Sequence, residues 1–272
     1  MKPRLRTAHL LVLTAFLVAG ATAFPALAER AAADQSSPRF PGGRYFVIGC
    51  GFSHFNNDDP IVFPRQPGKA HNHTFIGNRD VDAATTPASL LGGESSCGDV
   101  GDASAYWVPT LFVGRRAVKP LVGVGYYVRR TTGPVQAFPP GLKMIAGNQN
   151  ARRPQNLSVV GWACGGFGAE PRAAAVPSCP PDVSLHLRAT FPNCWNGRDL
   201  DSANHQRHLA YANGGQCPRS HPVALPSLVL IFLYPSTESG RPVQASGRFG
   251  THADFVNGWN QETLERLVAA LN

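Results

Sequence analysis

The segment 183–189 reads Val183-Ser184-Leu185-His186-Leu187-Arg188-Ala189, and its apolar side chains alternate with polar or small ones. Successive side chains of a β-strand point to opposite faces, so this alternation is typical of a strand with one buried face. Other short apolar segments are separated by stretches rich in Gly and Pro, of which the chain has 28 and 24. The predicted strands are Arg44–Gly51, Tyr106–Val113, Gly123–Arg130, Leu142–Ala146, Leu157–Ala163, Val183–Thr190 and Leu228–Leu233. We therefore predict a mainly β fold: a single, loop-rich, antiparallel β-sandwich-like domain.

One helix is predicted, at the C-terminus of the chain. Asn260 is a suitable N-cap, and Gln261 and Glu262 follow it in the first turn. An apolar stripe at helical spacing comprises Leu264, Leu267, Val268 and Leu271. We expect this short helix to cover one end of the sheet.

The N-terminus indicates export. Lys2, Arg4 and Arg6 precede an apolar run that ends near the small-x-small motif Ala26-Leu27-Ala28, as in a secretory signal peptide. We predict a signal peptide at residues 1–28, a flexible leader at 29–43 and one globular domain at 44–272. Later apolar runs are only as long as a strand, so no membrane span is expected after cleavage and the protein should be secreted.

The overall charge limits the class of partner. The formal net charge is +8, and removal of the predicted signal peptide lowers it because that segment holds three cations and no acid. The remaining charge is modest and forms no dense stripe of Lys and Arg, so specific nucleic-acid binding is not expected. Such a balance keeps a protein soluble and can favour an anionic wall polymer.

Six cysteines in a chain predicted to be exported indicate disulfides. The preferred pairs join cysteines that are neighbours in sequence, because the loops they close are filled with Gly and Pro. These pairs are Cys50–Cys97, Cys164–Cys179 and Cys194–Cys217. Each link should contribute on the order of 2–4 kcal/mol, mostly by restricting the unfolded chain. The alternative, a zinc-thiolate site, lacks any Cys-x-x-Cys motif.

Histidines gather in three short motifs, and these carry the main functional signal. In His71-Asn72-His73 and His252-Ala253-Asp254 two polar side chains at i and i+2 share one face of an extended backbone. In His205-Gln206-Arg207-His208 a spacing of three puts both rings on one face if the segment forms a helical turn. We predict that the three motifs meet in one polar cleft. The alternative for each motif is a pair of side chains hydrogen-bonded within a surface loop.

Two chemistries fit such a cleft. In the first, three or four imidazoles bind a divalent transition metal, with Asp254 as a further candidate ligand and one position open for water or substrate. The candidate histidine ligands are His71, His73, His205, His208 and His252. In the second there is no metal, and general acids and bases act on a polysaccharide. The candidate catalytic residues are then His205, His208, Tyr211 and Asp254, with Trp107, Trp195 and Trp259 as stacking surfaces.

Motifs of several enzyme classes are absent. The chain has no Gly-x-Ser-x-Gly elbow, no P-loop, no Gly-x-Gly-x-x-Gly motif that opens a helix and no His-Glu-x-x-His. A glycosidase needs two carboxylates in one cleft, and the sequence does not select a pair.

Several motifs, in order along the chain, resemble a known family. They are Asp59-Pro60-Ile61-Val62 after Cys50, Ala70-His71-Asn72-His73, Tyr106-Trp107-Val108-Pro109, residues 137–147, residues 191–197, residues 205–211, Cys217-Pro218 and residues 252–259. Over about residues 44–271 the chain resembles the secreted domain-of-unknown-function family numbered nineteen-ninety-six. The resemblance implies export and groups His71, His73, His205, His208, His252 and Asp254 as family motif positions. It implies no reaction.

The leading expectation is a secreted protein with a histidine-rich polar cleft that acts on, or binds, an extracellular or cell-wall polysaccharide. If it is an enzyme, a carbohydrate-active hydrolase or lyase is favoured. The alternatives are a non-catalytic carbohydrate- or wall-binding module and a metal-binding exported protein. A divalent transition metal is the cofactor that the metal alternative requires.

Overall fold

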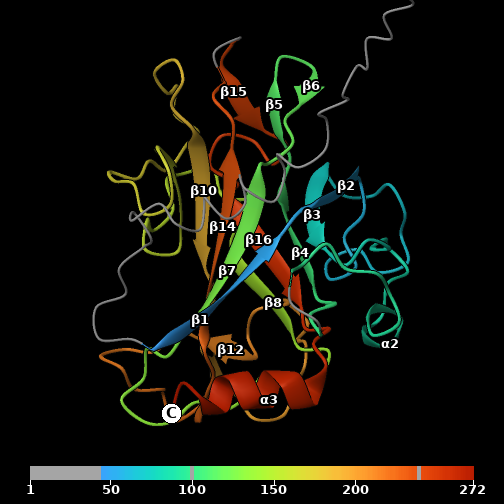
Figure 1. The fold of residues 1–272 in the computed structure, drawn as a ribbon, viewed down its shortest axis with the longest axis vertical. Coiled ribbons are helices and arrows are strands. Elements are labelled where there is room, and N and C mark those ends of the chain that lie inside the picture. The colour runs from blue at the N-terminus through green and yellow to red at the C-terminus, as the bar shows by residue number, and fades with distance from the viewer. Residues whose placement is uncertain (1–43, 99–100, 238–239) are drawn as a thin grey trace, which may run out of the picture. The chain divides into compact units, whose positions relative to one another are not determined.

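Two five-stranded antiparallel sheets dominate the fold (Figure 1). The computed structural model describes residues 44–98, 101–237 and 240–272. The first sheet has the strand order β1-β7-β14-β10-β9, and the second has the order β2-β3-β4-β16-β8. The predicted mainly β, antiparallel fold is confirmed. The predicted signal peptide and leader, residues 1–43, lie outside the described residues.

The bounds of the elements are as follows. The first sheet contains β1 (Tyr45–Cys50), β7 (Val122–Val128), β14 (Ser227–Tyr234), β10 (Leu185–Thr190) and β9 (Val160–Cys164). The second contains β2 (Phe52–Asn56), β3 (His73–Gly77), β4 (Ala105–Pro109), β16 (His252–Val256) and β8 (Lys143–Gly147). Two small sheets contain β12 (Leu209–Ala210), β11 (Cys194–Trp195) and β13 (Val223–Ala224), and β15 (Pro242–Gln244), β5 (Leu111–Val113) and β6 (Arg116–Ala117). The helices are α2 (Pro87–Leu90) and α3 (Gln261–Ala269).

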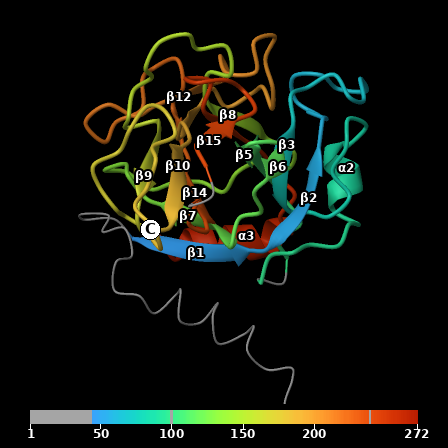
Figure 2. The ribbon, with the colours of Figure 1, turned by 90° about the horizontal axis from the view of Figure 1, so that it is seen from above.

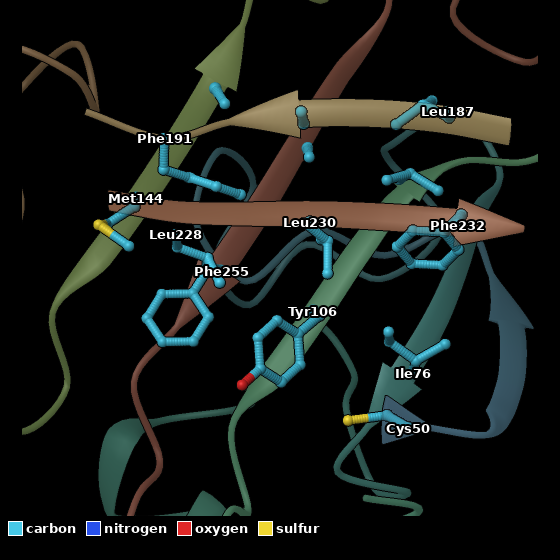
Figure 3. Close-up of a cluster of buried hydrophobic side chains, with 14 of the residues drawn as sticks. Cys50, Ile76, Tyr106, Met144, Leu187, Phe191, Leu228, Leu230, Phe232 and Phe255 are labelled. Atoms are coloured by element: carbon cyan, nitrogen blue, oxygen red, sulfur yellow. The ribbon is translucent and has the colours of Figure 1, made fainter. Parts of the chain in front are cut away.

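The hydrophobic core lies between the two large sheets (Figure 3). The first sheet contributes Leu187, Leu228, Leu230 and Phe232, and the second contributes Ile76, Tyr106, Met144 and Phe255. These side chains are almost completely buried. Full burial of a large apolar side chain contributes about 1.5–3 kcal/mol, so this shared core holds the sheets together.

The predicted C-terminal helix is confirmed as α3. The Asn260 side chain accepts a hydrogen bond from the Thr263 backbone N–H at 3.0 Å and so caps the helix. Three residues of the stripe, Leu264, Val268 and Leu271, are buried in the core, and Leu267 packs against it. As expected, the helix covers one end of the strands (Figure 1).

All three predicted disulfides are present: Cys50–Cys97, Cys164–Cys179 and Cys194–Cys217. The described cysteines are therefore all oxidised, which fits an oxidising compartment. Among the described residues, no helix has the length and apolar character needed to cross a membrane.

Eight of the strands overlap the seven predicted segments, whereas β3 and β16 are among the strands that were not predicted. Their outer faces carry His73 and Asp254, which are buried although they are polar. A polar residue on a buried face hides the apolar pattern of a strand. The predicted strand Tyr106–Val113 is two strands, β4 and β5, and the break follows Pro109, which has no N–H to donate.

Candidate metal centre

The outer face of the second sheet, away from the core, carries the histidine motifs. In the registers of β3, β4 and β16, Phe75 lies opposite Trp107, and Trp107 lies opposite Asp254. Side chains two residues apart share a face, so His73 joins this row from β3 and His252 joins it from β16. Phe255 points the other way, into the core, as the alternation of side chains along a strand requires.

Pro109 shapes the position where the histidines meet. His73 lies opposite Pro109, whereas His252 pairs only with Gly147 of β8. The β4–β16 ladder ends at Trp107 because proline cannot donate the next backbone hydrogen bond. The rings of His73 and His252 lie 5.7 Å apart, centre to centre.

A third ring completes the cluster. His71 precedes β3, and its ring centre lies 4.3 Å from that of His73 and 5.1 Å from that of His252. One ring nitrogen of each of the three histidines lies within 4.8 Å of the other two. The motifs 71–73 and 252–254, far apart in sequence, therefore meet as predicted.

Backbone carbonyls set the protonation of two of these rings. The Nδ1–H of His73 donates to the carbonyl of Asp58 at 3.0 Å, and the Nδ1–H of His252 donates to the carbonyl of Gly250 at 2.7 Å. A carbonyl only accepts, so Nδ1 must carry the proton in both rings and Nε2 must hold a lone pair. The Nε2 atoms of all three histidines are buried and have no hydrogen-bond partner in the described structure. A histidine held in this way by a carbonyl is the usual arrangement of a metal ligand.

The histidines are neutral, as metal ligands must be. Burial lowers the pKa of His71 to about 4 and that of His252 to about 3. Burial also holds the pKa of His73 well below its ordinary value, and the neighbouring His71 and His252 lower it further. At neutral pH the three lone pairs are available.

A buried carboxylate lies beside the three rings. Oδ2 of Asp254 is 3.5 Å from Nε2 of His252, and neither oxygen of Asp254 accepts a hydrogen bond in the described structure. Burial raises the pKa of Asp254 well above its ordinary value, and the negative charge of Asp59 raises it further. A carboxylate without donors is costly to bury, and a cation at the histidines would offset that cost.

The loop before β3 is held by Asp58 and Asp59. Oδ1 of Asp58 accepts from Gly68 N at 2.7 Å, and its Oδ2 accepts from Ala83 N at 3.1 Å. Oδ1 of Asp59 accepts from Ile61 N at 2.9 Å. These hydrogen bonds fix the loop so that the carbonyl of Asp58 accepts a hydrogen bond from the ring of His73. The sequence did not assign these two residues to the metal site, because the contact to His73 uses the main chain of Asp58 and leaves no signature in residue type.

The third motif lies beside the centre but supplies no ligand to the three-histidine group. Gln206 donates through Nε2 to the carbonyl of Gly147 at 2.8 Å, and Gly147 is the residue opposite His252. The ring of His208 lies between Ser202 Oγ at 3.0 Å and the carbonyl of Lys143 at 2.8 Å, so both of its nitrogens are already bonded.

The segment 205–208 is not a helical turn, which is the geometry in which its two rings would share a face. His205 has a left-handed backbone with φ of 59°, which a helix does not contain. Side-chain hydrogen bonds hold the turn instead, since Arg207 N donates to Ser202 Oγ and Asn204 Oδ1. Nδ1 of His205 pairs with Oδ1 of Asp201 at 2.9 Å.

The predicted aromatic surface does not form. Trp107 and Trp259 are 0% and 1% exposed, so the prediction that they stack on a sugar is wrong. Both complete the interior: Trp107 stacks on Phe75, and Trp259 donates through Nε1 to the hydroxyl of Tyr127. Trp195 is half-buried and donates to the carbonyl of Asp199.

Tyr211 lies in a different place from the three histidines. It lines a groove on the first sheet, and its hydroxyl donates to the carbonyl of Thr190 at 2.9 Å. The four predicted catalytic residues, His205, His208, Tyr211 and Asp254, are therefore not brought together around one reacting group.

Comparison with known proteins identifies a family but no relative of known activity. No curated protein and no solved structure matches the chain. Residues 59–259 match the family described as Domain of unknown function (DUF1996), and this range contains all three histidine motifs. The match spans most of the sequence, so the chain belongs to the DUF1996 family.

Proposed function

We propose that this protein binds one divalent transition metal ion through the Nε2 atoms of His71, His73 and His252. The observation that carries the proposal is the convergence of the three rings: one ring nitrogen of each lies within 4.8 Å of the other two. The Nε2 atom of each ring is also buried without a hydrogen-bond partner in the described residues. Three imidazoles with a fourth position for water form a familiar catalytic zinc site, and imidazole also suits copper, iron and nickel.

The charge around the rings supports a divalent cation. Neutral imidazoles contribute no charge, but Asp254 and Asp59 place two buried carboxylates next to them. Without a cation these acids repel each other, and each is deprived of water. A bound ion would favour the ionised form of Asp254, which would then balance part of the ion's charge.

The ion would be reached from the side of His71. This ring is half-buried, whereas His73 and His252 are 0% and 2% exposed. Near the centre, Lys143 and His205 pair with Asp201, and both side chains also interact electrostatically with Asp59. A water molecule on the open side of the ion would have a lowered pKa and could serve as a nucleophile.

His71→Ala is the sharpest test of metal binding, because this ring is the least buried ligand and makes no hydrogen bond to the part of the chain that the structure describes. Wild-type protein freed of metal should bind one Co²⁺ per chain with visible absorption bands, and the variant should bind at least tenfold more weakly. The control is His221→Ala, since His221 is also half-buried but has both ring nitrogens bonded, to Ser220 Oγ and the carbonyl of Arg207. Failure of the wild type to bind a stoichiometric ion, or equal binding by His71→Ala, would refute the proposal.

We also propose that the protein is exported and that the bound ion acts on an extracellular polysaccharide. The half-buried His71 supports this, because it leaves the ion a side on which water and a sugar hydroxyl can approach. The same two variants separate this use from metal binding alone. Metal-loaded wild type and His221→Ala should release reducing ends from a panel of wall polysaccharides, and metal-free wild type and His71→Ala should release at least a hundredfold less. Equal release by all four samples would overturn polysaccharide action at this centre and leave metal binding intact.

A further inference from the structure

A groove of about 1080 Å³ lies on the first sheet, away from the histidine cluster. Its walls include Thr190 of β10, Val128 of β7 and Ser227 of β14, all at the same end of the sheet, where Val128 pairs with Ser227. Arg44, next to β1, and Val159, next to β9, extend the walls to both edge strands. Four inter-strand spacings amount to ~19 Å, so the groove is long enough for several units of a polymer.

Arginines supply the charge of this groove. Arg44, Arg129, Arg130 and Arg188 line it, and no Asp or Glu is among the lining residues. Burial, together with the charges of Arg172 and Arg130, lowers the pKa of Arg188 to about 10. Arg188 remains charged at neutral pH, so like charges gather here. Guanidinium groups bind carboxylates and sulfates in a forked, two-bond geometry, and an anion would relieve the repulsion.

Asn193 offers a donor that the fold leaves unused. Its side chain is 4% exposed, it lines the groove, and its Nδ2 has no hydrogen-bond partner among the described residues. The residue is rigidly held, because its Oδ1 accepts from Ala212 N at 3.1 Å and its backbone bonds to Ala210 and Leu225. A buried amide without a partner is costly unless a ligand oxygen accepts from it.

Tyr211 adds an aromatic wall. The residue is 43% exposed, and the hydrogen bond of its hydroxyl to the Thr190 carbonyl holds the ring in place. A fixed ring with an open face suits the apolar face of a sugar. Threonine, serine and asparagine side chains make up much of the remaining wall.

We propose that this groove binds an acidic polysaccharide, whose carboxylate or sulfate groups pair with Arg44 and Arg188 and whose sugar oxygens accept from Asn193. The guanidinium of Arg129 already donates to backbone carbonyls and contributes only its charge. The proposal narrows the polysaccharide proposed above to an acidic one, but it places binding on a different sheet from the metal centre. Binding should therefore need no metal ion. Arginine, a single aromatic ring and small hydroxyl groups fit a charged sugar better than a nucleic acid, which is bound through dense Lys and Arg with several stacking rings.

Titration calorimetry with four polymers tests the inference: polygalacturonate, dextran sulfate, neutral dextran and single-stranded DNA of similar length. Wild-type protein in chelator should bind one or both acidic polysaccharides more tightly than DNA or neutral dextran, with affinity that falls as salt is added. Tighter binding of polygalacturonate identifies the carboxylate as the recognised group, and tighter binding of dextran sulfate identifies the sulfate.

The paired substitution Arg44→Gln and Arg188→Gln should weaken this binding at least tenfold. The matched control is Arg115→Gln with Arg116→Gln, which removes the same charge from an exposed hairpin outside the groove. If Arg188→Gln prevents folding, Arg44→Gln with Tyr211→Ala replaces it, since both side chains are exposed. His71→Ala should bind the polymer as wild type does, so that failure of the metal centre and failure of the groove are distinguishable. Equal loss in the control pair, or binding of DNA or neutral dextran as tight as that of the acidic polymers, overturns the proposal.

Discussion

At the scale of single residues, Asp254 shows most clearly how the centre departs from ordinary packing. Its two oxygens are buried without a hydrogen bond in the described structure, beside a second buried acid, Asp59. A raised folded-state pKa means that the carboxyl group opposes folding increasingly as the pH rises above its unfolded value. The ionised side chain of Asp254 therefore lowers the stability of the metal-free protein, and it is stabilising only when a cation is bound nearby.

Asp254→Asn should make the metal-free protein more stable and should reduce the stabilisation that a bound metal ion provides. The amide keeps the shape, loses the charge and can donate to Nε2 of His252, which lies 3.5 Å from Oδ2 in the native protein. Urea unfolding in chelator at pH 8 should show a gain on the order of 1 kcal/mol, smaller at pH 5. Added Zn²⁺ should stabilise the variant less than the wild type. The half-exposed Asp201→Asn is the control, and a less stable Asp254→Asn protein at pH 8 would contradict this account.

At the scale of elements, the burial of β3 and β16 explains why the apolar pattern of the sequence did not predict these two strands. Both faces of the second sheet are covered, the inner by the first sheet and the outer by a smaller cluster around Ile61, Phe75 and Trp107. A strand buried on both faces tolerates a polar residue only where a partner or a ligand compensates it. His73 and Asp254 are such residues, and their position on buried strands is itself a functional signal.

The terminal helix α3 follows the opposite rule, because its sequence pattern alone predicts its packing. Leu264→Ala removes a side chain that is 0% exposed in the core and should lower the free energy of unfolding by about 2–5 kcal/mol. Leu267→Ala, at a half-buried position of the same stripe, should cost clearly less. Urea unfolding of the two variants is the measurement. Equal losses would show that the helix does not close the core in the way described.

At the scale of the whole molecule, the histidine centre and the arginine groove lie on different sheets, with the shared hydrophobic core between them. The histidine centre lies on the outer face of the second sheet, and the arginine groove lies on the first sheet. Because the core between them is close-packed, each surface can change its side chains without repacking the other. Metal binding and polymer binding are therefore expected to be independent in their free energies.

Stability of the metal-free molecule should fall as the pH is lowered from about 6.5 to about 4. Burial lowers the pKa of six histidines: His54, His71, His73, His186, His208 and His252. In this window the histidines of the unfolded chain become protonated, whereas the buried histidines of the folded chain stay neutral. Lowering the pH therefore favours unfolding. The fully buried His73 and His252 should each cost about 1.4 kcal/mol for every pH unit below 6.5, whereas the partly exposed rings contribute less because water screens them.

Denaturant unfolding in chelator at several pH values measures this loss. Asp254 and Asp59 act with the opposite sign, because their folded-state pKa values are raised, but they are two groups against six. A free energy of unfolding that stays constant or rises between pH 6.5 and pH 4 would show that these histidines are not buried as neutral rings.

The sequence by itself determined the mainly β class and the terminal helix, and it favoured the three disulfide pairs that the structure contains. The alternation of apolar and polar residues predicts the strands, and the N-cap with its apolar stripe predicts the helix. The disulfides join cysteines that are neighbours in sequence. All three are local patterns, so they can be read from the sequence. It also named His71, His73, His252 and Asp254. Only the tertiary structure decided that these four residues meet. It places His205, His208 and Tyr211 in hydrogen bonds with Asp201, Lys143 and Thr190 instead. That choice depends on strand register and on main-chain contacts such as the carbonyl of Asp58 on His73, which join distant residues and leave no pattern in the sequence.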